Sequence, residues 1–476
     1  MLRKKARSAV FWSGLDIFAR QGIGFAITII LARLLVPEDF GTIALLSLFM
    51  GIAHLFVSAG FSAALIQKQD TTHTDESTVF WFNLGAGVVV TGVLFSLSPF
   101  IANFFDLPVL TPLTMLLACN VFISALGSIH GTLFTKQLDF KTPMKIGVIS
   151  TLISGGVGVY MAWADYGIWA LAGQALVSTV VGTVLLWYFS TWRPLFVFSR
   201  DSFRRLFGFS GWLFASGMLD TLYLRGYTLL IGKFYGTHDL GIYSRADSTQ
   251  QLPASILTGV LSRVAFPLFS SVNEDKERLR RGVRVSIRTM MLIMIPIMMG
   301  LAVLAEPFIQ VVFGEQWLPA APIMQVLCVA GMLYPLHVIN LNVLQAQGHA
   351  NLFFRLEVVK KSSGIVLLIV GSFFGVMGIA WSRVISSIVG LAINGHYTHK
   401  YLDYSMREQI KDCIPSILLG VIMAYAVAMA DIWIEIGGII ELLLMILLGA
   451  VFYIVSNILL GTSAFKEAAG FIRGRG

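Results

Sequence analysis

Long apolar segments follow one another along almost the whole chain, and short connections between them carry most of the charge. Each segment has roughly 20 residues or more, which is the length that a helix needs to cross a bilayer. The segments are continuous and do not alternate, so helices are favoured over a membrane β-barrel. We predict fourteen spans, at 9–33, 40–66, 79–103, 109–134, 143–165, 167–190, 205–233, 239–270, 282–306, 318–346, 350–374, 376–398, 410–432 and 437–461.

The composition supports an all-α integral membrane protein. Hydrophobic residues make up 56% of the chain and charged residues 13%, whereas about 25% of the residues in a soluble domain are charged. If the N-terminus is cytoplasmic, most of the 34 Lys and Arg residues fall in inward connections, and Arg33 and Lys233 fall in outward ones. Membrane proteins show this excess of positive charge on the cytoplasmic side. Both termini are therefore predicted in the cytoplasm. The net charge of +8 is explained by topology and anionic membrane lipid, not by nucleic acid.

The second half of the chain repeats the pattern of the first half. At an offset of 200, the matched pairs are Trp12 with Trp212, Arg33 with Lys233, Asp39 with Asp239, and Gly41 with Gly241. Spans 1–6 and 7–12 are therefore predicted to be two pseudo-symmetric six-helix lobes of the same orientation, as in transporters built from parallel repeats.

These repeats predict four regions, an N-lobe at 1–190, a cytoplasmic linker at 191–204, a C-lobe at 205–400, and two further helices with a cytoplasmic tail at 401–476. The segment around the linker, Thr191–Phe207, mixes Phe and Leu with four arginines. It fits an interfacial segment lying against headgroups, and it fits equally an ordinary positive loop.

Charged residues inside the predicted spans gather on spans 1, 7 and 8. Asp16 and Arg20 are four residues apart on one helical face, and Asp220 follows Arg20 at an offset of 200. The same group includes Arg225, Arg245 and Asp247, whereas Arg383 on span 12 is isolated. A charge at the bilayer centre costs at least about 2.5–3.5 kcal/mol, so such residues usually face a partner or water.

Three stretches of sequence resemble one transporter family. They are R-K-x-A-x-x-x-x-x-W at Arg3–Trp12, LARLLVPEDFGTIAL at Leu31–Leu45, and RPLFVFSRDSFRRLFGFSGW at Arg193–Trp212. The chain resembles Wzx-type oligosaccharide flippases of the multidrug/oligosaccharidyl-lipid/polysaccharide exporter superfamily. That resemblance implies alternating-access movement of undecaprenyl-pyrophosphate-linked oligosaccharide across the bacterial inner membrane, for exopolysaccharide or lipopolysaccharide. It also implies a polysaccharide polymerase complex as a partner, and a central crevice lined by spans 1, 7 and 8.

The resemblance gives the intramembrane charges a hypothetical role. Arginine offers a planar, permanently charged fork that binds phosphate oxygens bidentately. We expect the diphosphate to be bound by Arg20, Arg225 and Arg245, and these arginines to be positioned by Asp16, Asp220 and Asp247. Candidate glycan contacts are Gln250, Gln251 and Asn340, although the polar residues near Asn340 could equally bridge helices. The alternative for the charges is purely structural pairing.

No motif of an enzyme is evident. The sequence contains no G-x-x-x-x-G-K-[ST] loop, no H-E-x-x-H and no metal-ligand cluster of Cys and His, so neither a cofactor nor a metal is predicted. Three other functions stay open: a cation-coupled multidrug antiporter, a lipid II flippase, and a non-transporting scaffold in polysaccharide assembly.

Overall fold

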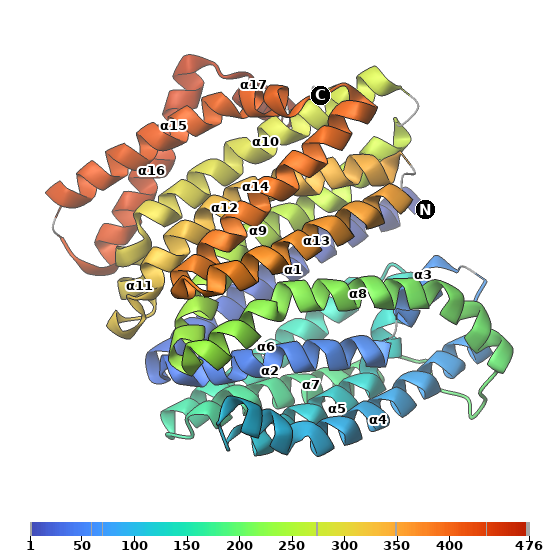
Figure 1. Cartoon of the computed structure of the whole chain (residues 1–476). Coiled ribbons are helices and arrows are strands. Elements are labelled where there is room, and N and C mark those ends of the chain that lie inside the picture. Colours follow the sequence, from blue (N-terminus) through green and yellow to red (C-terminus); the bar gives the residue numbers. More distant parts are fainter. Residues whose placement is uncertain are drawn as a thin grey trace. The chain divides into compact units, whose positions relative to one another are not determined.

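The computed structural model describes residues 2–58, 60–68, 70–272, 275–347, 350–434 and 436–472. Every regular element within these ranges is a helix, which confirms the predicted all-α class (Figure 1). Eleven of the helices are long and apolar enough to cross a membrane. Helices α8, α9 and α13 are not among the eleven, although they have 35, 36 and 23 residues. The total of fourteen spans and the cytoplasmic side of the termini therefore stay predictions.

Packing divides the chain into an N-terminal unit, Met1–Gly241, and a C-terminal unit, Ile242–Gly476. The N-terminal unit holds eight helices and the start of α9: α1 (Leu2–Leu34), α2 (Pro37–Ser58), α3 (Phe61–Gln67), α4 (His73–Phe105), α5 (Leu110–Lys136), α6 (Lys141–Trp163), α7 (Ile168–Phe189) and α8 (Arg200–Phe234). In this unit α4 packs against α5, α6 against α7, and α1 against α6. Helix α8 packs against α2, α3 and α4. The lobe boundary that the repeat predicts at 191–204 stays a prediction.

The C-terminal unit begins within α9 (Gly236–Ser271). It continues with α10 (Lys276–Val303), α11 (Ala305–Val312), η1 (Glu315–Trp317), α12 (Ala320–Ala346), α13 (Ala350–Ser372), α14 (Gly375–Leu402), α15 (Met406–Trp433), α16 (Gly438–Leu460) and α17 (Ser463–Ile472). Helix α10 lies between two other long helices and packs against both α12 and α15. Its buried face, which includes Leu279, Val283 and Ile287, joins Ile339 and Val343 of α12 in one hydrophobic core.

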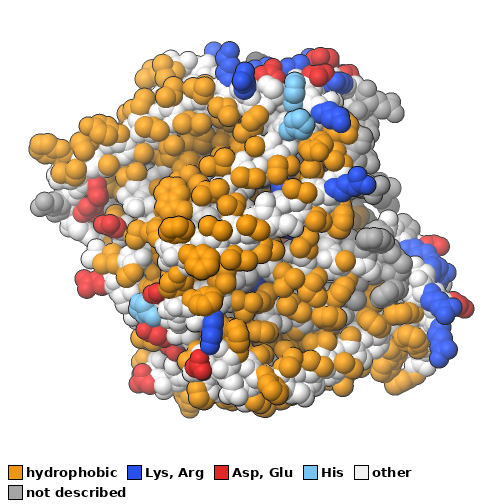
Figure 2. All heavy atoms as spheres, viewed as in Figure 1, with side chains coloured by type: hydrophobic (Ala, Val, Ile, Leu, Met, Phe, Trp, Pro, Cys, Tyr) orange, Lys and Arg blue, Asp and Glu red, His pale blue; other side chains and the backbone are white. Residues whose placement is uncertain are grey.

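The outer faces of the helices are apolar as well. Figure 2 shows hydrophobic side chains over most of the viewed surface, with charged side chains gathered toward its edges. On α16, for example, Ile439, Leu443 and Leu447 are all exposed. A water-soluble protein rarely exposes such continuous apolar surface, whereas a lipid-facing helix requires it. The protein is therefore a multi-pass membrane protein, as its composition predicted.

The first turns of two repeat-related helices, α2 and α9, meet backbone to backbone in the N-terminal unit. A Cβ atom on Gly41 would overlap the carbonyl group of Thr237, and a Cβ atom on Gly241 would overlap the carbonyl group of Pro37. The two contacts exchange under the offset of 200, which is the arrangement that like segments give across a two-fold axis. Beside them, His238 Nδ1 lies 2.7 Å from Glu38 Oε1.

Replacement of Gly41 by alanine is expected to destabilise the protein by about 1–3 kcal/mol, because the added methyl group meets a backbone carbonyl that cannot rotate away. Gly92→Ala on α4 is the matched control, since nothing lies within 4 Å of its Cβ position. Alanine is there expected to be neutral or slightly stabilising. Thermal unfolding in detergent measures both variants, and equal midpoints would contradict the close contact.

Candidate functional site

The first candidate site lies on α1, where Asp16 and Arg20 form an ion pair one helical turn apart. The Arg20 side chain is 49% exposed and that of Asp16 is 17% exposed. Oδ1 of Asp16 is buried and has no hydrogen-bond partner. The carboxylate therefore holds the arginine in place while half of the arginine side chain stays accessible.

Helix α6 supplies the surface against which Arg20 lies. A Cβ atom on Gly147 would overlap the Cδ atom of Arg20, so this glycine makes room for the arginine side chain. Nearer the start of both helices, Lys141 Nζ lies 5.2 Å from the centroid of the Trp12 ring. The polar face of α1 is thus packed on α6, and this packing fixes the direction of the Arg20 side chain.

Asp220 and Arg225 lie on α8 of the same unit. The Arg225 side chain is exposed, and Asp220 is partly buried. The backbone carbonyl of Arg225 accepts a hydrogen bond from Thr228 Oγ1 at 2.7 Å. Arg225 therefore presents a second accessible cation on a helix that was predicted to line the substrate path.

Arg245 of the C-terminal unit is in a different environment. Its side chain sits between the rings of Phe313 and Trp317, with the guanidinium carbon 5.0 and 4.9 Å from the two centroids. Arg245 is 5% exposed, and Trp317 is fully buried. A desolvated cation between aromatic faces gains roughly 2 kcal/mol from cation–π attraction. The arginine is thus both charged and enclosed.

Asp247 pairs with an arginine to which no role could be assigned from the sequence. Its Oδ1 atom lies 3.2 Å from Nη1 of Arg383 on α14. The isolation of Arg383 along span 12 was the available signal, because a charge within a span needs a partner on another helix. The two residues are 136 positions apart, so helical spacing could not identify the pair.

Asp247→Asn is expected to lower the stability of the protein by about 1.5–3 kcal/mol, because a neutral amide replaces the carboxylate that pairs with the positive charge of Arg383. Exchanging the two residues, as Asp247→Arg with Arg383→Asp, is expected to restore part of that loss. Thermal unfolding of the single and double variants tests this. A double variant that is no more stable than either single one would rule out the pair as the source of the effect.

The three candidate glycan contacts differ in their surroundings. Gln250 is buried against Gly331, where a side chain would overlap it, and its Nε2 atom lies 3.7 Å from the sulfur of Met298. Gln251 is exposed. Asn340 is fully buried, and it donates to Gln409 Oε1 at 3.0 Å and accepts from Thr398 Oγ1 at 2.9 Å. The geometry favours helix bridging for Asn340, whereas Gln251 remains accessible to a ligand.

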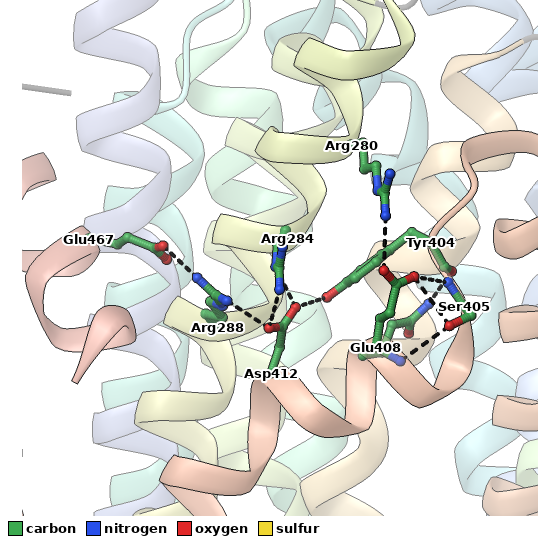
Figure 3. A network of polar contacts seen from close by, with 9 residues as sticks. Arg280, Arg284, Arg288, Tyr404, Ser405, Glu408, Asp412 and Glu467 are labelled. Carbon is green, nitrogen blue, oxygen red and sulfur yellow. Dashed lines mark hydrogen bonds and ion pairs between the residues drawn. The ribbon is translucent and has the colours of Figure 1, made fainter.

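A larger polar network in the C-terminal unit was not predicted (Figure 3). Asp412 of α15 accepts hydrogen bonds from Arg284 at 2.7 and 2.8 Å and from Arg288 at 2.7 Å. Tyr404 donates to the same carboxylate at 2.7 Å. Burial and this hydrogen bond raise the pKa of Tyr404, so its hydroxyl group stays protonated and keeps donating.

The same network reaches a third helix, α17, and a second carboxylate of α15. Arg288 also donates to Glu467 of α17 at 2.8 Å, and Arg280 donates to Glu408 at 2.9 Å. The arginines at 280, 284 and 288 share one helical face, and this spacing was a visible signal. In the sequence, these arginines contribute to the excess of positive charge in an inward connection. The network ties α10, α15 and α17 together.

The profile of the polysaccharide biosynthesis protein family matches residues 30–322, which is well over half of the chain. The chain belongs to this family. A second family profile, that of the lipid II flippase MurJ, matches residues 228–449. The resemblance proposed from the sequence is thereby confirmed.

Individual relatives agree with the family. The teichuronic acid biosynthesis protein TuaB of Bacillus subtilis is 33% identical over 353 residues, covering 72% of this chain and 71% of the relative. The lipopolysaccharide biosynthesis protein WzxC of Escherichia coli is 28% identical over 401 residues, covering 83% and 80%. Among solved structures, the inward closed conformation of the lipid II flippase MurJ has a TM-score of 0.77. At 17% identity it covers 95% of this chain and 98% of its own, which shows the shared fold.

Proposed function

We propose that this protein flips an undecaprenyl-pyrophosphate-linked oligosaccharide from the inner to the outer leaflet of the bacterial inner membrane, for surface polysaccharide assembly. Membership of the polysaccharide biosynthesis family is the observation that carries the proposal. The protein then acts as a transporter that makes and breaks no covalent bond. On the outer leaflet its cargo becomes available to a polymerase complex, which we propose as its partner.

The diphosphate of the cargo is the group that the accessible arginines would bind. Arg20 has the required features, because Asp16 holds it and half of its side chain is exposed. An arriving diphosphate would exchange with the Asp16 carboxylate, since each group offers two oxygen atoms to the two parallel N–H groups of the guanidinium. The exposed Arg225 on α8 would supply a second positive charge.

Arg245 is proposed as the third contact to the diphosphate. It is 5% exposed and lies over the rings of Phe313 and Trp317, so an anion reaches it only when neighbouring side chains move. Asp16 and Asp220 are proposed to position the arginines of the N-terminal unit, and Asp247 to act through Arg383. Gln251 is the exposed candidate for a sugar hydroxyl. In alternating access the headgroup crosses between two lobes while the polyprenyl tail stays in lipid.

Lipid II is the second candidate cargo. The MurJ profile match over residues 228–449 favours it, and so does the fold similarity. The diphosphate chemistry of the two cargoes is alike, so the arginines do not distinguish them. A multidrug antiporter is less favoured, because a pocket for cationic drugs needs excess negative charge. The candidate residues on α1, α8 and α9 are three arginines and three aspartates, so they carry no excess of negative charge.

The deciding experiment is leaflet-resolved detection of polyprenyl-diphosphate-linked sugars in a strain that lacks this protein. We expect the lipid-linked oligosaccharide to accumulate on the cytoplasmic leaflet, with loss of surface polysaccharide. Accumulation of the peptidoglycan precursor instead would assign the lipid II cargo. If both lipid-linked pools keep their wild-type distribution between leaflets, the flippase proposal is wrong.

A further inference from the structure

The segment between α7 and α8, Thr191–Ser199, forms no helix, yet its backbone is fastened to α4. Trp81 Nε1 donates to the carbonyl oxygen of Leu195 at 2.7 Å, and the Leu195 N–H donates to Ser77 Oγ at 3.0 Å. Further along, the Ser199 N–H donates to Thr78 Oγ1 at 3.1 Å. These bonds join residues more than 110 positions apart, so tertiary structure fixes the path of the segment.

Arg193 fastens the other end of the segment. Its guanidinium group donates to the carbonyl oxygens of Ser190 and Trp192, both at 2.7 Å, and of Trp187 at 3.1 Å. It also lies over the Trp187 ring at 5.4 Å. These carbonyls belong to the end of α7 and the residues that follow it, so the Arg193 guanidinium group has a structural role in holding the chain after α7.

Between these fixed points four consecutive apolar side chains are exposed, those of Leu195, Phe196, Val197 and Phe198. Phe196 is 92% exposed, and its ring lies near that of Trp81, with a centroid distance of 5.3 Å and a tilt of 35° between the ring planes. We call Leu195–Phe198 the apolar ridge. Four exposed apolar residues in a row are unfavourable in water and are typical of an interaction surface.

Basic residues follow the apolar ridge directly. Helix α8 begins at Arg200, capped by the Ser199 side chain, and Arg200 and Arg204 are both exposed and one turn apart. Arg205 pairs with Asp75 at 2.7 Å. Lys and Arg side chains gather at the right-hand edge of Figure 2, where Figure 1 shows the start of α8. Apolar residues beside basic ones match a layer of acyl chains below anionic headgroups.

We propose that the apolar ridge, with Arg200 and Arg204, is a binding site for anionic phospholipid at the cytoplasmic surface of the membrane. The aromatic side chains enter the acyl-chain boundary, and the two guanidinium groups bind the headgroup phosphate. Because the backbone is already held by α4, the site is preorganised, and little conformational freedom is lost on binding. The proposal is independent of which lipid-linked sugar the protein carries.

The test measures lipid binding to the purified full-length protein by native mass spectrometry, with phosphatidylglycerol and phosphatidylcholine as the two probes. We expect the wild type to prefer phosphatidylglycerol. The double variant Arg200→Gln, Arg204→Gln is expected to lose that preference, by about fivefold for each arginine. Phe196→Ser is expected to weaken the binding of both lipids alike.

Two control variants distinguish binding at this site from a general effect of surface charge or surface hydrophobicity on lipid binding. Arg281→Gln removes an exposed arginine from α10, and Phe373→Ser removes an exposed aromatic ring near the end of α13. Both are expected to bind lipid as the wild type does. If the double variant keeps the wild-type preference, the proposal is overturned. If the ridge variants bind lipid normally but lose polysaccharide export in cells, the ridge binds a cytoplasmic protein partner instead, and the proposal is equally overturned.

Discussion

Arg20→Ala is expected to abolish export of the lipid-linked oligosaccharide while the amount of folded protein in the membrane stays the same. Export should fall at least about tenfold, because a charge-assisted hydrogen bond to an ionised group contributes about 1.5–3 kcal/mol. The stability cost should be small, since an exposed ion pair contributes about 0–1 kcal/mol. Surface polysaccharide in a complemented deletion strain measures export, and membrane immunoblotting measures the protein.

Conservative variants show which property of Arg20 matters. Arg20→Lys keeps the charge but loses the planar fork, so partial export is expected. Arg281→Ala, the matched control, removes an exposed arginine on α10 and should export normally. Normal export by Arg20→Ala at equal expression would remove the centre of the proposed diphosphate site, although it would leave the family assignment intact.

Asp412→Ala is expected to destabilise the C-terminal unit by about 3–5 kcal/mol. The Asp412 side chain is 3% exposed and accepts hydrogen bonds from Arg284, Arg288 and Tyr404. Its removal leaves the Arg288 side chain, which is largely buried, without a partner on α15. Thermal unfolding in detergent should show a clearly lower midpoint, together with reduced accumulation in cells.

Smaller changes to the same network should have graded effects. Tyr404→Phe removes one of the hydrogen bonds and is expected to cost about 1 kcal/mol. Glu277→Ala, in the exposed first turn of α10, is expected to change stability by less than about 0.5 kcal/mol. An Asp412→Ala protein that unfolds at the wild-type temperature would show that the arginines find water or other partners at no net cost.

The sequence predicted what depends on local patterns. Segment length and charge asymmetry were enough for an all-helical membrane protein, because a bilayer demands long apolar helices whose backbone is satisfied internally. The Asp16–Arg20 pair was also predictable from a local pattern, because residues four apart in a helix lie on the same face. Even the repeat was visible, through matches such as Gly41 with Gly241.

Contacts between distant helices could not be predicted from one sequence. Asp247 pairs with Arg383 of α14, which is 136 positions away, and Arg245 lies against the rings of Phe313 and Trp317. Asn340 offered equal chances of binding sugar or bridging helices until its neighbours were known. Hydrogen-bonding capacity can be read from a side chain type, whereas the partner that satisfies it depends on the tertiary fold.

The meeting of Gly41 and Gly241 has a consequence for how this protein can evolve. Each glycine faces a main-chain carbonyl of the opposite helix, at Thr237 of α9 and Pro37 of α2. A carbonyl is present whatever residue occupies those positions, so no exchange of amino acid on one helix can create space for a side chain on the other. A genetic screen for suppressors of a bulky Gly41 variant should therefore return true revertants, or changes that shift a whole helix. If the two halves arose by duplication, this restriction was inherited twice from a single ancestral glycine.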